Sequence, residues 1–214
     1  IFSSSAAVYG SSGPGAVSEE YRGIPQNPYG RNKQMIEDIL HDLYVSDSSW
    51  NIIILRYFNP VGGKKFADKA ESLLDHIVAV AAGKKEKLTI YGADYSTYDG
   101  TCVRDYVHVI DLAEIHVLAL EKLAYTPGVK VYNVGSGKGC SVLDLVKTFQ
   151  QTVGINVSYV IADRRPGDIA ESYADTRKAA SQLEFKPRRS LEEACRDAWV
   201  WHKRREEMCG HRIK

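Results

Sequence analysis

The 214-residue sequence lacks several features that mark specialised classes of protein. It has only four cysteines, far apart and without a C-x-x-C pair, so nothing indicates a disulfide framework or a metal site. The 28 Lys and Arg nearly balance the 27 Asp and Glu, which gives no reason to expect binding to nucleic acid or to an anionic membrane. No apolar run reaches the roughly 18 residues that a membrane span needs. Free thiols in a reducing compartment are the simplest interpretation, and we expect a cytoplasmic protein.

What the sequence does contain is an alternation of strand and helix patterns, which is typical of α/β proteins. Residues 51–57 form a continuous apolar run with β-branched residues, which predicts a strand covered on both faces. A helical stripe follows Pro28, a residue that suits a first helical turn. This stripe consists of Met35, Ile36, Ile39, Leu40 and Leu43. Further strands are predicted at 1–5, 88–91, 107–110, 129–134 and 157–161, and further helices at 73–82, 111–123, after Ser141 and after Ser190.

Tyr29 and Lys33 stand four residues apart at the start of the predicted helix. Side chains at this spacing share one helical face, and an ammonium near a phenol favours the ionised phenol. Such a tyrosine can act as a general acid and base. The Y-x-x-x-K pattern is common by chance, so the pair alone is weak evidence. Ser5 ends the first predicted strand, where α/β sheets place ligands, although a serine that only completes a turn is commoner.

A series of longer motifs carries a resemblance over nearly the whole chain. They are S-S-S-A-A-V-Y-G (3–10), N-P-Y-G-R-N-K (27–33), L-R-Y-F-N-P-V-G (55–62), Y-G-A-D-Y-S-T-Y-D-G-T-C-V-R-D-Y-V-H-V-I-D-L-A (91–113), Y-N-V-G-S-G-K-G-C-S-V-L (132–143) and R-R-P-G-D (164–168). In this order they closely resemble the UDP-glucose 4-epimerases, a family of extended short-chain dehydrogenases/reductases. The order and number of the motifs make this resemblance far more specific than the tyrosine–lysine pair alone.

The resemblance implies an enzyme that interconverts UDP-glucose and UDP-galactose through a transient 4-keto sugar and an enzyme-bound NAD. Tyr29 would remove the proton of the sugar 4-hydroxyl, and Ser5 would bond to the same oxygen. Lys33 would hold the nicotinamide ribose. The implied partners are the UDP-sugar and a second copy of the chain in a homodimer, with no nucleic acid, membrane or metal.

The same resemblance assigns cofactor and substrate contacts. The implied NAD contacts are Ser5, Tyr29, Lys33, Tyr57 and Phe58. The implied UDP-sugar contacts are Asn59, Ser72, Leu73, Tyr91, Arg104, Arg165, Asp168 and Ser172. The paired donors of arginine suit a diphosphate, and the small side chain of Ser172 leaves room for an N-acetyl group on the sugar. The segment G-S-G-K-G at 135–139 is interpreted as a connector, because it fits neither the dinucleotide fingerprint nor a P-loop.

Two departures from the family bear on activity. The sequence has no G-x-x-G-x-x-G turn to seat the NAD pyrophosphate, and its first residues resemble a strand already under way. We therefore expect an N-terminally truncated and inactive fragment. The segment after residue 62 is also shorter than in the family, and Ser72 replaces an asparagine that contacts substrate.

The expected fold is α/β, with part of a Rossmann domain and a smaller UDP-sugar lobe. Residues 1–62 would form the remnant of the doubly wound parallel sheet. Residues 63–214 would form the substrate lobe, with 107–123 packing back on the sheet.

Two alternatives remain open. One is a related NDP-sugar epimerase or dehydratase, although dehydratases need acidic residues beside the serine position, where Ala6 stands. The other is a degenerate, non-catalytic chain that binds a partner or nothing, which the missing glycine-rich turn favours.

Overall fold

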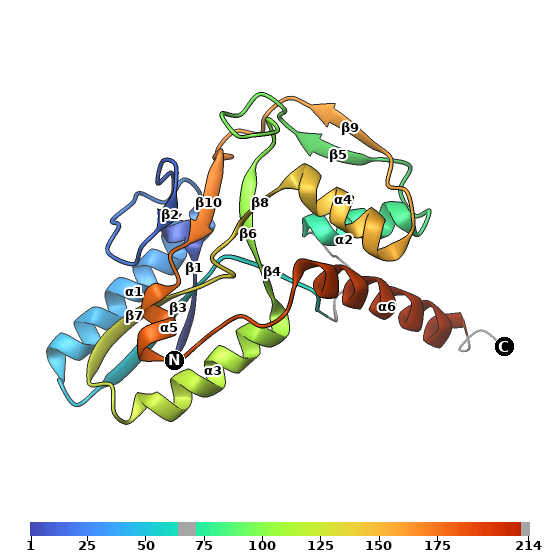
Figure 1. The fold of residues 1–214 in the computed structure, drawn as a ribbon. Coiled ribbons are helices and arrows are strands. Elements are labelled where there is room, and N and C mark those ends of the chain that lie inside the picture. Colours follow the sequence, from blue (N-terminus) through green and yellow to red (C-terminus); the bar gives the residue numbers. More distant parts are fainter. Residues whose placement is uncertain (64–71, 211–214) are drawn as a thin grey trace.

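Strands and helices alternate along the chain and form two lobes that lie side by side, which confirms the α/β class (Figure 1). This computed structural model describes residues 1–63 and 72–210. Its strands are β1 (Phe2–Ser5), β2 (Ala16–Val17), β3 (Asn51–Tyr57), β4 (Asn59–Val61), β5 (Leu88–Tyr91), β6 (Val103–His108), β7 (Gly128–Val134), β8 (Gly139–Ser141), β9 (Tyr159–Ala162) and β10 (Glu171–Ala174). Its helices are η1 (Ala6–Val8, a 3-10 turn), α1 (Pro28–Ser46), α2 (Leu73–Ala81), α3 (Val109–Leu123), α4 (Val142–Val153), α5 (Arg177–Gln182) and α6 (Leu191–Gly210).

The first lobe is built on a parallel sheet with the strand order β1-β3-β7. Ile53 and Leu55 of the central strand β3 are fully buried and pack with Ile115 of α3 on one face of the sheet. On the opposite face Arg56 of β3 pairs with Glu37 of α1. The sheet therefore lies between α1 and α3, as in doubly wound α/β folds.

The lobes do not divide at residue 62, where the sequence places the boundary. β7 pairs with β3 along its whole length, from Asn51 opposite Gly128 to Tyr57 opposite Val134, and so belongs to the first lobe. α3 and α5 join it and pack on the same sheet. The cause is that β3 is apolar on both faces, so it needs strands on both edges and helices on both sides. Of the elements that pack against β3, the residues before 62 supply only β1 and α1.

A buried carboxylate joins the second sheet, of order β2-β10-β6-β4, to the loop after β7. Asp105 of β6 accepts hydrogen bonds from Ser136 N and Oγ, both at 2.6 Å. Gly137 N and Ala174 N also donate to it, at 3.0 Å and 3.1 Å. Burial raises the pKa of Asp105, and these donors oppose the rise. The amides of G-S-G-K-G thus serve an internal carboxylate, in agreement with its interpretation as a connector.

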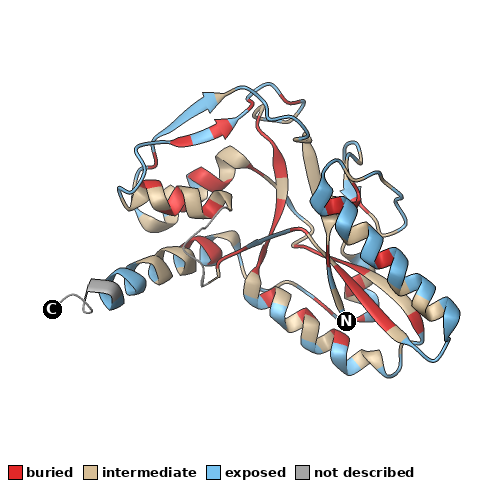
Figure 2. Cartoon of the chain, turned by 180° about the vertical axis from the view of Figure 1, so that it is seen from behind, coloured by how far each residue is buried: buried red, intermediate tan, exposed pale blue. Residues whose placement is uncertain are grey.

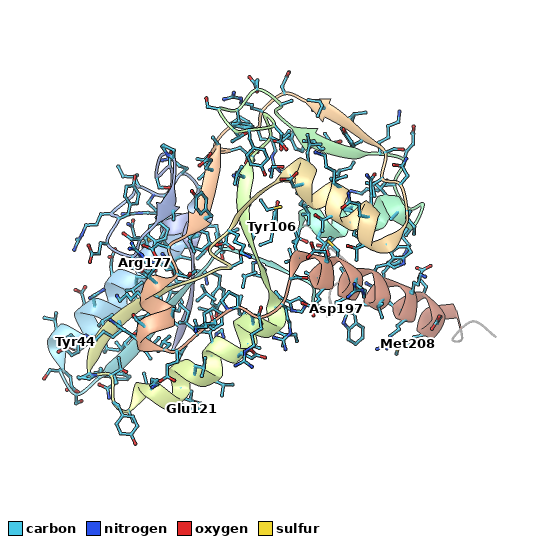
Figure 3. The ribbon with its side chains drawn as sticks, viewed as in Figure 1. Tyr44, Tyr106, Glu121, Arg177, Asp197 and Met208 are labelled. Atoms are coloured by element: carbon cyan, nitrogen blue, oxygen red, sulfur yellow. The ribbon has the colours of Figure 1, made fainter. Side chains whose placement is uncertain are left out.

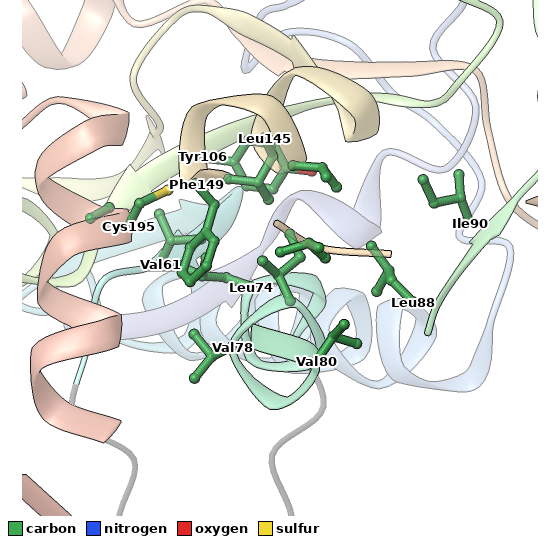
Figure 4. Close-up of a cluster of buried hydrophobic side chains, with 14 residues drawn as sticks. Val61, Leu74, Val78, Val80, Leu88, Ile90, Tyr106, Leu145, Phe149 and Cys195 are labelled. Carbon is green, nitrogen blue, oxygen red and sulfur yellow. The ribbon is translucent and has the colours of Figure 1, made fainter. Parts of the chain in front are cut away.

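The second lobe has a separate apolar core formed by α2, α4, α6 and β5 (Figure 4). Ile77 of α2 and Leu145 and Phe149 of α4 are fully buried in it. The Phe149 ring meets the edge of Trp199 of α6 at a centroid distance of 6.3 Å. β5 pairs in parallel with β9, and its Ile90 completes the core. This lobe therefore has packing of its own, independent of the first sheet.

The boundary between β6 and α3 differs from the sequence pattern. The predicted strand at 107–110 is divided, because β6 ends at His108 and α3 begins at Val109. His108 Nδ1 accepts a hydrogen bond from Ile110 N at 3.1 Å and so caps α3.

No helix within residues 1–63 and 72–210 is both long and apolar enough to cross a membrane.

The predicted apolar stripe of α1 lies largely in solvent (Figure 2). Met35, Ile36 and Ile39 are 49 %, 38 % and 61 % exposed. The buried positions of α1 are Gly30 and Glu37 instead. The helical spacing was correct, but the sheet contacts a different side of the helix.

Candidate active site

Three consecutive serines in β1 have three different environments at the carboxyl end of the first sheet. Ser4 Oγ lies 2.5 Å from Glu37 Oε1 on the α1 face. Ser3 Oγ, on the α3 face, is hydrogen-bonded to the Tyr57 hydroxyl at 2.7 Å. Ser5 is half-buried, and its Oγ accepts a hydrogen bond from Ala7 N at 3.2 Å, which caps η1. Ser5 thus both completes a turn and presents a hydroxyl where parallel sheets place ligands.

Tyr29 and Lys33 occupy the first turns of α1 beside these serines. Asn27 Oδ1 caps the helix by accepting from Gly30 N at 2.8 Å, with Pro28 at the first position. Tyr29 is 56 % exposed, so its phenol is open to a ligand. The labelled Tyr44 marks the opposite end of this helix (Figure 3).

The Lys33 ammonium lies next to both Tyr29 and β1. Its Nζ is 5.7 Å from the centroid of the Tyr29 ring and 5.0 Å from that of Phe2. It donates a hydrogen bond to Ser3 O at 2.8 Å. Because an ammonium has three donors, this contact leaves donors for the hydroxyls of a ribose. The structure therefore places Lys33 next to Tyr29 and against β1.

The last residue of β3 and the two residues after it lie next to this region. Tyr57 lies opposite Ser5 in the sheet, and burial raises the pKa of its phenol. Phe58 is buried and packs against Val8 and Tyr9. Asn59 is exposed at the start of β4 and is available to a ligand.

A second group of predicted residues gathers beyond β5. The Arg165 guanidinium stacks on the Tyr91 ring at 4.6 Å. Its Nε donates to Asp168 Oδ2 at 2.9 Å, and its Nη2 donates to Asp168 Oδ1 at 3.4 Å. Of these three side chains, the guanidinium has the paired donors that suit a phosphate group.

The remaining predicted substrate residues lie in regular structure. Arg104 of β6 is opposite Ser172 of β10, and Arg104 Nη1 donates to Val103 O at 2.8 Å. Ser72 and Asp75 form the capping box of α2, so the Ser72 hydroxyl already has a structural partner. Leu73 packs against the core of the second lobe. In the described part of the chain, no cluster of three or more His, Cys, Asp or Glu side chains could hold a metal ion.

Comparison with known proteins identifies the family of this chain. The profile of the NAD dependent epimerase/dehydratase family matches residues 1–135. The chain belongs to this family.

Three members of the epimerase/dehydratase family show how far the similarity extends. The UDP-glucose 4-epimerase of Bacillus subtilis is 47 % identical over 208 residues, which are 94 % of this chain and 61 % of that protein. A crystal structure of UDP-glucose-4-epimerase from Stenotrophomonas maltophila, with bound NAD and formylated UDP-arabinopyranose, has a TM-score of 0.93 at 41 % identity. It covers 97 % of this chain, and the match covers 64 % of that one.

The third is a crystal structure of UDP-glucose 4-epimerase from Bifidobacterium longum in complex with NAD+ and UDP. This structure has a TM-score of 0.91 to the present chain at 40 % identity. Its match covers 96 % of this chain and 64 % of that one. The chain thus spans about three fifths of the length of these family members.

The structure of the present chain also contains a buried ionic network that the sequence motifs did not indicate. Glu37 Oε1 accepts from Arg56 Nε at 3.0 Å, and Glu37 Oε2 lies 2.5 Å from Arg56 Nη2. The guanidinium stacks on the Tyr9 ring at 4.8 Å, and burial raises the pKa of Tyr9 to about 12. The sequence does carry one signal of this network, which is Arg56 inside the apolar run of β3. A buried charge there requires a partner of opposite charge.

A cavity of about 820 Å³ opens beside this network, between α1 and residues 19–23. Its walls include Glu37, Arg56 and His41, and none of the predicted catalytic or substrate residues. This cavity and the candidate active site are therefore different places.

Proposed function

We propose that this chain carries the catalytic and UDP-sugar-binding residues of a UDP-glucose 4-epimerase that acts with NAD. The observation that carries the proposal is that Lys33 lies beside Tyr29 and is hydrogen-bonded to β1, the strand that ends at Ser5 in a parallel sheet. The similarity to UDP-glucose 4-epimerases over almost the whole chain supports it.

In the proposed reaction, the Tyr29 oxygen takes the proton of the sugar 4-hydroxyl and later returns it. The Lys33 ammonium lies 5.7 Å from the Tyr29 ring, close enough to act on the same substrate and cofactor. Ser5 donates a hydrogen bond to the same sugar oxygen and fixes its position. Half-buried Tyr57 and buried Phe58 limit the access of water to this region.

The residues present fit the nicotinamide end of NAD. Bound NAD supplies an acceptor, and then a donor, of hydride. Lys33 offers donors to the ribose, while Tyr57 ends β3 opposite Ser5 and Phe58 follows it. The glycine-rich turn that would hold the pyrophosphate is not in the 214 residues, so this chain supplies only part of the NAD site.

Calorimetric titration of the 214-residue chain with UDP tests the substrate side of the proposal. We expect UDP to bind, because the Tyr91, Arg165 and Asp168 group is formed within this chain. The Arg165→Ala variant should bind UDP about 10- to 100-fold more weakly, the effect of losing charged hydrogen bonds to a diphosphate. Arg177→Ala is the matched control, because Arg177 also pairs with a carboxylate but its side chain is 90 % exposed. Equal UDP affinity in both variants would contradict the proposed role of Arg165.

We further propose that the protein forms a homodimer through α1. The support is the exposed stripe of Met35, Ile36 and Ile39, since exposed apolar patches mark association surfaces. Sedimentation of the chain and of an Ile36→Asp, Ile39→Asp variant tests this, with a dimer expected for the first and a monomer for the second. A wild-type monomer at high concentration would refute the dimer for this chain.

We also propose a cytoplasmic location. Cys102, Cys140 and Cys195 carry free thiols, which persist in a reducing compartment. Cell fractionation with a compartment marker checks this proposal, and recovery from an oxidising compartment would refute it.

A further inference from the structure

A histidine outside every predicted site is hydrogen-bonded into the candidate active site. His116 of α3 lies across the sheet from α1, with its ring 5.6 Å from that of Tyr57. Its Nε2 is in hydrogen-bond contact with the Tyr57 hydroxyl and lies 3.4 Å from Ser3 Oγ. The Tyr57 hydroxyl is in turn 2.7 Å from Ser3 Oγ. Side chains from α3, β3 and β1 therefore meet at one point.

The other ring nitrogen of His116 anchors the ring to its own helix. Nδ1 lies 2.7 Å from Leu112 O, a carbonyl that can only accept, so Nδ1 donates this hydrogen bond. Nε2 therefore faces the Tyr57 hydroxyl, which donates to Ser3 Oγ at 2.7 Å. A hydrogen-bonded chain thus joins His116, Tyr57 and Ser3.

The same serine holds the lysine of the reacting centre. Ser3 O accepts the hydrogen bond of the Lys33 ammonium at 2.8 Å, while Ser3 Oγ belongs to the chain described above. The position of Ser3 at the exposed edge of the sheet is thus determined from both sides. A shift of β1 would move the acceptor of Lys33, and a displacement of about 1 Å at a reacting centre can cost on the order of 100-fold in rate.

We propose that His116 is a positioning residue that fixes Ser3 through Tyr57 and thereby holds the Lys33 ammonium beside Tyr29. The contacts are independent of any ligand, whereas the importance of Lys33 for NAD rests on the proposed function. His116 reaches no reacting atom itself. Its effect passes through two hydroxyl groups, so it can be tested by removing one polar group of the chain at a time.

The test measures how fast Lys33 of the 214-residue chain is acylated by a limiting amount of an N-hydroxysuccinimide ester, read peptide by peptide in a mass spectrometer. Three variants are compared with the wild type. His116→Leu removes the hydrogen-bonding ring nitrogen, His116→Gln restores a polar group at the end of the side chain, and Tyr57→Phe removes only the phenol oxygen. Lys147, which is 60 % exposed in α4 of the other lobe, is the internal control.

We expect Lys33 to react about fivefold faster in His116→Leu and Tyr57→Phe, the equivalent of one lost hydrogen bond. His116→Gln should stay close to the wild type, and Lys147 should react at one rate in all four proteins. Unchanged Lys33 reactivity in both His116→Leu and Tyr57→Phe would overturn the proposal. If circular dichroism shows that His116→Leu is unfolded, Tyr57→Phe decides alone, because it keeps the ring that packs against the core.

Titration of the same proteins with NAD separates this inference from the proposed function. Faster acylation of Lys33 without any NAD binding would support the positioning role and count against the cofactor site. NAD binding that is equal in wild type and Tyr57→Phe, together with unchanged acylation, would support the cofactor site and overturn the positioning role.

Discussion

Replacement of Tyr29 by phenylalanine is expected to lower the turnover number for UDP-glucose by about 10²- to 10⁴-fold, the usual contribution of a general acid and base. The phenol oxygen is the only part of the side chain that the change removes. Tyr29 is 56 % exposed, so its loss leaves the packing of α1 intact. The measurement is the rate of UDP-galactose formation by a chimera in which the N-terminal part of the Bacillus subtilis relative precedes Ile1.

Two comparisons make this result specific. Tyr125→Phe, at an 84 % exposed position after α3, should retain the full rate. The affinity of Tyr29→Phe for UDP should be unchanged, because Tyr91 and Arg165 form the other group of site residues. Turnover within threefold of the parent chimera would show that Tyr29 is not the acid and base, by the same scale.

Replacement of Glu37 by alanine is expected to lower the free energy of unfolding by about 3–5 kcal/mol, the cost of leaving a buried charge without its partner. The Arg56 guanidinium side chain is only 14 % exposed, and Glu37 is its carboxylate partner. Ser4 also loses its acceptor at 2.5 Å. Since a domain is stable by about 5–15 kcal/mol, this one change would remove a large share of the total. Urea denaturation of the chain measures it.

The neighbouring Asp38→Ala is the matched control, because Asp38 is exposed on the same helix; it should change the stability by about 0.5 kcal/mol or less. Adding Arg56→Met to a Glu37→Leu variant should recover most of the loss, since an apolar pair carries no desolvation cost. A loss below about 1 kcal/mol for Glu37→Ala would mean that water reaches Arg56 and that the pair behaves as a surface ion pair.

The sequence predicted those elements whose signal is local. β3 has the predicted bounds of 51–57 because a continuous β-branched run has no other stable environment. α1 begins at Pro28, the residue that the sequence placed in its first turn. The short strands β4 and β10 were missed, because a few mixed residues carry no periodicity and depend on their neighbours.

Contacts between distant segments could not be predicted from local patterns. The return of β7 to the first sheet pairs residues far apart in the sequence, which moved the expected lobe boundary. His116 follows no motif, because one histidine in a helix resembles any other until its neighbours are known. The adjacency of Tyr91, Arg165 and Asp168 is seen in the structure, whereas their contacts with a UDP-sugar stay predictions. Tolerance of N-acetylated sugars through Ser172 also stays a prediction, which turnover of UDP-N-acetylgalactosamine by the chimera would check.

The pairing of β7 with β3 has a consequence for synthesis on the ribosome. Tyr57 leaves the peptidyl transferase centre long before Val134, its neighbour in the sheet. At about 5–20 residues per second, this interval lasts roughly 4–15 s. One edge of β3 lacks its partner for all of that time, and the Ile53 and Leu55 face lacks α3 for the earlier part of it. A chaperone that binds emerging apolar strands should therefore crosslink to this segment, and release it once α3 and β7 have emerged.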